Sequence, residues 1–153
     1  MAETPRRGDV PGIQIHLRRG FGESRSTLWS WLTEADRLRS WLADRAEVDL
    51  GEAGGFRLES LREDAGPVVE TAKTLALEPE SRWELEFRRD DPLWEGTTLL
   101  EWGLHDARDG CELEVFQEGF QRLALSSCLT IWEDYRRRWR ACLDRLDLRL
   151  RGG

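Results

Sequence analysis

Apolar residues recur at helical spacing in the C-terminal part of the chain, from about residue 123 to 146. The stripe consists of Cys128, Ile131, Trp132, Tyr135, Trp139, Cys142, Leu143 and Leu146. Offsets of three, four, seven and eleven residues place such side chains on one face of an α-helix. The other face is charged, with Glu133, Asp134, Arg136, Arg137, Arg138, Arg140, Asp144 and Arg145. The pattern predicts one long amphipathic helix that needs a broad apolar partner.

Short segments upstream of that helix alternate apolar and polar residues, which is the period of a half-buried β-strand. The clearest is 83–87, where Trp83, Leu85 and Phe87 alternate with glutamates. Similar alternation predicts further strands near 13–18, 48–58, 69–77, 100–104 and 113–115. The pair Gly54-Gly55 interrupts the second of these and suits a tight turn or bulge with positive φ.

Between the first two strands the spacing becomes helical. Ser24 or Ser26 can cap a short helix that turns Leu28, Trp29 and Leu32 inward. A second short helix follows Thr33 and carries Leu38, Trp41 and Leu42. We therefore predict an α+β domain over 13–148, in which a curved antiparallel sheet of about seven strands surrounds the C-terminal helix. Residues 1–12 are expected to form a loose arm, and 149–153 a C-terminal tail.

Composition and charge narrow the classes of partner. The chain has 153 residues, 39% hydrophobic and 35% charged, with a net charge of −7. This excess of acidic residues over basic ones disfavours nonspecific binding to nucleic acid or to an anionic membrane, because such binding requires clustered Lys and Arg. The arginines at 136–138 and 140 are interpreted as a solvated helix face, with a docking patch for an acidic partner as the alternative. With no apolar run long enough to span a bilayer, we expect a cytoplasmic protein.

Candidate catalytic groups are sparse. His16 falls on the polar face of its strand and His105 in a predicted turn, while most strand glutamates face solvent by parity (Glu70, Glu101, Glu112 and Glu114). The cysteines Cys111, Cys128 and Cys142 lack CxxC spacing and are interpreted as packed thiols, with Cys128 as a nucleophile the weaker alternative. We therefore predict no catalytic residue, no metal site and no cofactor.

Short motifs occur in an order that resembles a known family. They are Leu28-Trp29, Leu32-Thr33, Leu38, Trp41, Gly54-Gly55-Phe56, Gly110-Cys111 with Leu113 and Val115, Gly119-Phe120 and Trp132. Their order and spacing resemble the heat-shock-protein ATPase-activator homologue (AHSA-type) family of the START-like, or SRPBCC, superfamily. The resemblance extends from about residue 15 to 146. Three positions depart from the family pattern, which commonly has threonine at Cys111, histidine at Gln117 and glycine at Ile131.

The resemblance implies the helix-grip fold, in which a curved antiparallel sheet holds the last helix and two short helices close one end. Relatives include lipid and hormone binders, polyketide cyclases and chaperone activators, and many hold an apolar cavity between sheet and helix. The main hypothesis is therefore a noncatalytic domain that binds an apolar or aromatic small molecule there. The residues expected to line the cavity are Trp41, Phe56, Leu58, Trp83, Leu85, Phe87, Leu100, Trp102, Cys128 and Trp132.

Two alternatives stay open. The first is protein interaction in the manner of chaperone activators, through Trp31, Trp94 and the arginine-rich helix face, because exposed tryptophans often mark interfaces. The second is a cyclase-like enzyme that acts chiefly by shaping its substrate. The inward tryptophans equally suit a filled aromatic core, and the sequence leaves the oligomeric state open.

Overall fold

The computed structural model describes residues 13–62 and 66–152; the predicted arm at 1–12 lies outside them. The elements in chain order are β1 (Gln14–Phe21), α1 (Arg25–Thr33), α2 (Ala35–Trp41), β2 (Arg45–Asp49), β3 (Gly55–Arg62), β4 (Gly66–Glu78), β5 (Arg82–Arg89), β6 (Thr98–Ala107), β7 (Gly110–Glu118) and α3 (Cys128–Gly152). A single 3-10 turn at Phe120–Arg122 precedes α3. The predicted α+β layout is confirmed.

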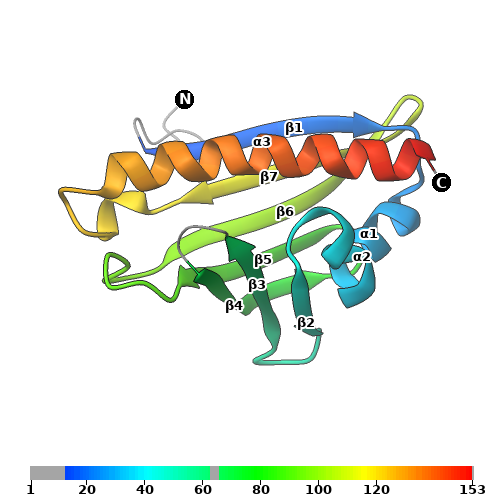
Figure 1. Ribbon diagram of the computed structural model, residues 1–153. Coiled ribbons are helices and arrows are strands. Elements are labelled where there is room, and N and C mark those ends of the chain that lie inside the picture. Colours follow the sequence, from blue (N-terminus) through cyan, green and yellow to red (C-terminus); the bar gives the residue numbers. More distant parts are fainter. Residues whose placement is uncertain (1–12, 63–65, 153) are drawn as a thin grey trace, which may run out of the picture.

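The strands form one seven-stranded antiparallel sheet in the order β1-β7-β6-β5-β4-β3-β2. α3 lies along β1 and β7, and the sheet curls from there through β6 and β5 toward β2 (Figure 1). Trp83, Leu85 and Phe87 on β5 are buried, as their alternation predicts. On α3 the buried positions are Cys128, Tyr135, Trp139, Cys142, Leu143 and Leu146, whereas Ile131 and Trp132 are half-buried.

α3 begins and ends later than the apolar pattern predicts. Residues 123–127 form a turn instead of helix, and the helix continues through Gly152, so the predicted tail is helical as far as that residue. The extension has tertiary contacts: Leu150 packs against the core, and Arg149 Nε donates to the Ser40 carbonyl oxygen at 3.1 Å. These contacts favour helix where the local sequence has only a weak apolar signal.

The two short helices close one end of the sheet, as predicted. The Ser24 side chain caps α1 by accepting from the Thr27 N–H at 3.2 Å. The Trp41 indole N–H donates to the Trp31 carbonyl oxygen at 3.0 Å and joins α2 to α1. Trp41 also lies 6.3 Å from Trp102, measured between ring centroids, so α2 covers the end of the aromatic core.

The glycine pair marks the start of β3. Gly55 has φ +154°, and a β-carbon there would lie 1.8 Å from the Ala72 carbonyl oxygen on β4. A β-carbon on Gly54 would lie 2.2 Å from the Asp49 carbonyl oxygen. Only glycine therefore allows β3 to approach its neighbours here, which agrees with the turn or bulge that the sequence predicts.

Gly55→Val should lower the free energy of unfolding by more than about 1 kcal/mol, because the side chain would clash with the β4 backbone. Gly20→Ala is the matched control, since a β-carbon on Gly20, in β1, would meet nothing within 4 Å. Urea unfolding of both variants measures the difference. Equal midpoints for the two variants would contradict the close approach at Gly55.

Candidate functional site

Among the described residues, a small void lies between the sheet and α3. It has a volume of about 10 Å³ and is lined by Leu42, Leu58, Glu70, Phe87, Tyr135, Arg138 and Trp139. A space of this size is at the lower limit for one water molecule. The expected open cavity is therefore a small void in this structure.

Nine of the ten residues expected to line a cavity are buried: Trp41, Phe56, Leu58, Trp83, Leu85, Phe87, Leu100, Trp102 and Cys128. Only Leu58 and Phe87 touch the void. The others pack on one another, for example Phe56 stacked on Trp102 with 5.6 Å between ring centroids. Trp132, the tenth, is half-buried at β1, where its indole N–H donates to the Gln14 carbonyl oxygen at 2.8 Å.

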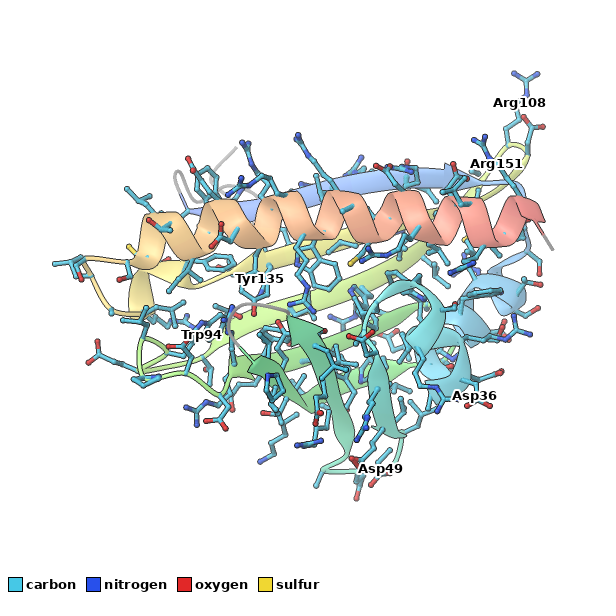
Figure 2. The ribbon with its side chains drawn as sticks, in the orientation of Figure 1. Asp36, Asp49, Trp94, Arg108, Tyr135 and Arg151 are labelled. Carbon is cyan, nitrogen blue, oxygen red and sulfur yellow. The ribbon has the colours of Figure 1, made fainter. Side chains whose placement is uncertain are left out.

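A buried ion pair lies beside the void. Glu70, on β4, is completely buried, and both nitrogens of the Arg138 guanidinium fork donate to its carboxylate, one of them at 2.6 Å. The Tyr135 hydroxyl donates to the same carboxylate. Figure 2 shows the Tyr135 side chain extending from α3 toward the sheet. These three residues join the middle of α3 to β4 by charge-assisted hydrogen bonds.

The environment sets the charge state of this group. Burial, and then the charge of Glu70, raise the pKa of Tyr135 well above its ordinary value, so Tyr135 remains a neutral donor. Burial is the largest single influence and would lower the pKa of Arg138, but the charge and the hydrogen bonds of Glu70, with the smaller effects of Tyr135 and Cys142, together raise the pKa. The Arg138 guanidinium therefore stays charged beside Glu70, and this pairing explains how its charge is tolerated at the edge of the core.

The sequence prediction was wrong for Glu70 and Arg138, which were both expected to face solvent. A bulge at Leu75 reverses the alternation along β4, so that Glu70 and Ala72 face inward and Leu75 is 51% exposed. Glu101 is also buried, although parity predicted exposure for most strand glutamates. Arg138 lies three residues after Tyr135 and four before Cys142, and this spacing was the available signal that it shares their helix face.

A second buried polar contact joins α3 to β6 and β7. The Gln117 amide donates to the Thr98 hydroxyl at 2.9 Å and accepts from the Trp139 indole N–H at 2.8 Å. Both Gln117 and Thr98 are buried. Gln117 therefore orients the Trp139 side chain.

A cleft of about 450 Å³ opens beside the void. Its walls are the end of α2 and the residues after it, the facing ends of β3 and β4, and the C-terminal half of α3. The cleft and the void share Leu42 and Arg138. These two side chains therefore separate the interior of the domain from the solvent-filled cleft.

The outer face of the sheet has different chemistry. A hollow of about 600 Å³ crosses β2–β5, and the charged residues that line it are of both signs (Glu47, Asp49, Arg57, Lys73, Glu86 and Arg88).

Farther along this face, two histidines bind the Glu114 carboxylate. They are His16, which is exposed as predicted, and His105, at 2.9 Å. Burial raises the pKa of Glu114, but the hydrogen bonds from the two histidines outweigh it and lower the pKa. No group of three or more His, Cys, Asp or Glu among the described residues could hold a metal ion.

The two tryptophans expected at an interface are not free side chains. Trp94 is 3% exposed, because the loop after β5 folds back and places its ring 5.6 Å from Tyr135 (Figure 2). The prediction of exposure for Trp94 was wrong. Trp31 is half-buried, with the Arg37 guanidinium 4.8 Å above its ring.

The three cysteines are buried free thiols, as predicted, and burial raises the pKa of Cys111 and Cys142.

The curved sheet, the long helix in its concavity and the two short helices after β1 define a START-like helix-grip domain. Within this class, residues 23–151 match the model of the family described as activator of Hsp90 ATPase homolog 1-like protein, and the chain belongs to that family. None of the curated proteins compared with the chain matches it.

Solved structures show the same fold at low sequence identity. A protein from Rhodobacter sphaeroides has a TM-score of 0.76 and 20% identity, with 94% of this chain and 96% of that chain covered. A protein from Mesorhizobium loti has a TM-score of 0.72 and 19% identity, covering 90% and 96%. CalU16 from Micromonospora echinospora has a TM-score of 0.68 and 22% identity, with 91% of this chain and 74% of that chain covered.

Among the described residues, no helix is long and apolar enough to cross a membrane.

Glu70→Gln should lower the free energy of unfolding by about 3–5 kcal/mol, because Arg138, whose side chain is 21% exposed, would lose its carboxylate partner inside the fold. The double variant Glu70→Gln/Arg138→Met removes both charges and keeps an acceptor for Tyr135, so it should recover much of the loss. Urea unfolding of both variants measures the effect. A double variant that is no more stable than Glu70→Gln would show that the charge pairing is not what holds this contact.

Proposed function

We propose that this protein is a noncatalytic binding protein for a small apolar or aromatic molecule, held between the sheet and α3. The observation that carries the proposal is the void beside the cleft, with only Leu42 and Arg138 shared between them. Leu58, Phe87 and Trp139 supply apolar surface at the void. Ligand sites are typically concave and mostly apolar, with a few placed polar groups, and Glu70, Tyr135 and Arg138 are such groups.

Binding requires side chains to move, because about 10 Å³ is far less than the volume of any organic ligand. Leu42 is the side chain that would move, since it borders open space on the cleft side, whereas Arg138 is held in place by Glu70. The remaining aromatic residues pack against one another and form the fixed wall. The ligand would therefore enter from the cleft and enlarge the void.

The alternatives have less support. The half-buried Trp31 and the exposed arginines 136, 137 and 140 still support the protein-interaction hypothesis. Trp94 no longer supports it, because its side chain is buried. A cyclase-like reaction needs an acid or base that faces substrate. Glu70 is the acid nearest the void, and its carboxylate is occupied by Arg138 and Tyr135.

Leu58→Ala should raise the affinity for the neutral probe N-phenyl-1-naphthylamine by about tenfold or more, because the truncation enlarges the void beside the cleft. Leu104→Ala is the matched control: Leu58 and Leu104 are each 2% exposed, but Leu104 does not line the void. Probe fluorescence and quenching of tryptophan emission measure binding, with circular dichroism to confirm that each variant is folded.

Each truncation should cost about 2–5 kcal/mol of stability, so the comparison is made between variants of similar stability. Equal gains in affinity for Leu58→Ala and Leu104→Ala would mean that any core cavity accepts the probe. That result, or no binding to the wild type and to Leu58→Ala, would contradict the proposed site.

A further inference from the structure

We propose that the cleft between α2, α3 and the ends of β3 and β4 binds the anionic group of an amphiphilic ligand, a carboxylate or a phosphate monoester. The inference rests on the proposed function and names the chemistry of the ligand. Its apolar part would lie in the enlarged void, and its charged group would lie among the arginines of the cleft.

The arginines come from one face of α3 and from α2. Arg138, Arg145 and Arg149 are spaced by seven and four residues, which places them along one side of the helix. Arg145 Nε donates to the Trp41 carbonyl oxygen at 3.2 Å, and Arg149 Nε donates to the Ser40 carbonyl oxygen at 3.1 Å. These bonds to the end of α2 hold both guanidinium groups at the cleft.

The hydrogen bonds to the end of α2 use only some of the N–H donors of Arg145 and Arg149. A guanidinium has five N–H donors, and each carbonyl contact uses one. Arg145 also points one terminal nitrogen at the Cys142 sulfur, 3.3 Å away, and a thiol is a weak acceptor. The terminal nitrogens that remain have the planar, forked geometry that matches the oxygens of a carboxylate or phosphate.

The charge balance of the cleft is opposite to that of the chain. Among the described residues, its lining has four arginines and one acid, Asp44, in a chain of net charge −7. The Asp44 carboxylate accepts the Leu61 N–H at 2.7 Å, and Arg39 is paired with Asp36 at 2.5 Å. The local excess of positive charge therefore rests on Arg145 and Arg149.

These two arginines also differ from Arg137 and Arg151 on the same helix. Arg137 pairs with Asp134 and Arg151 with Asp147, while Asp144 pairs with Arg19 of β1. Across the described ranges, 13–62 and 66–152, neither Arg145 nor Arg149 has a carboxylate within 4 Å. An external anion would supply the kind of partner that Arg137 and Arg151 already have.

Apolar side chains also line the cleft. They are Leu42, Ala43, Leu61 and Val68, and Leu61 is 62% exposed although it is a large apolar residue. A cleft lined by both arginines and apolar side chains fits a molecule with an alkyl or aromatic body and one anionic end. It fits a free amphiphile better than a bilayer surface, which the acidic exterior would repel.

The test compares decanoate with decanol, which share the ten-carbon chain and differ in charge. Calorimetric titration of the wild type below the critical micelle concentration should give at least tenfold tighter binding of decanoate. Raising NaCl from 50 to 500 mM should weaken decanoate binding and leave decanol binding unchanged, because salt screens charges that are exposed to water.

Arg145→Gln/Arg149→Gln should reduce decanoate affinity at least tenfold and leave decanol affinity unchanged. The control Arg137→Gln/Arg140→Gln makes the same charge change on exposed positions of α3 outside the cleft and should alter decanoate affinity less than twofold. An equal loss in the control would overturn the inference, because it would show a general charge effect. If the first pair does not fold, nuclear magnetic resonance of the wild type replaces it: decanoate should shift the Nε–H signals of Arg145 and Arg149, and unshifted signals would overturn the inference.

The outcomes separate the two proposals. Equal affinity for decanol and decanoate would overturn the anion site and leave the proposed function standing. Arginine-dependent binding of inorganic phosphate, without binding of decanoate or decanol, would support the anion site and contradict the apolar ligand. Binding to phosphatidylserine vesicles without binding of monomeric decanoate would overturn the assignment to a free amphiphile.

Discussion

The packing of α3 against the concave face of the sheet is the contact on which the rest of the structure depends. Tyr135 and Trp139 are large side chains on the buried face of α3, and a curved sheet can contact them on more sides than a flat one, as close packing requires. The sheet therefore curls around them, with Gly55 allowing close approach at β3 and the bulge at Leu75 changing the course of β4. Trp102 joins the layers, with its ring 6.1 Å from Trp139 and 5.9 Å from Trp83.

Two polar contacts orient the helix within this apolar packing. Glu70 with Arg138 joins α3 to β4, and Gln117 with Trp139 joins it to β7. Hydrophobic burial has little directional preference, whereas an unsatisfied buried donor or charge is costly. Rotation or sliding of α3 would break both contacts at once. They therefore favour one register of the helix on the sheet.

The same arrangement places the candidate site at the edge of the core. The aromatic residues fill the middle of the domain, so the space that remains lies where α2, β3, β4 and α3 meet. Arg138 has a structural role on the inner side, through Glu70, and borders the cleft on the outer side. Arg145 and Arg149 similarly hold the end of α2 while facing the cleft. The residues that stabilise this corner of the fold are thus also the ones available to a ligand.

The sequence by itself determined the order of the elements, the inward faces of β5 and α3 and the helix-grip class. The first two depend on local periodicity: Trp83, Leu85 and Phe87 alternate on β5 whatever lies across from them, and the stripe from Cys128 to Leu146 identifies the helix. The helix-grip class followed instead from the resemblance of short motifs to a known family. Only the tertiary structure decided the inward turn of Glu70, the burial of Trp94 and the cleft itself. A bulge reverses strand parity without a sequence signal, and a loop residue is buried or exposed according to what it folds against. The grouping of arginines from α2 and α3 likewise depends on contacts between residues about 100 positions apart.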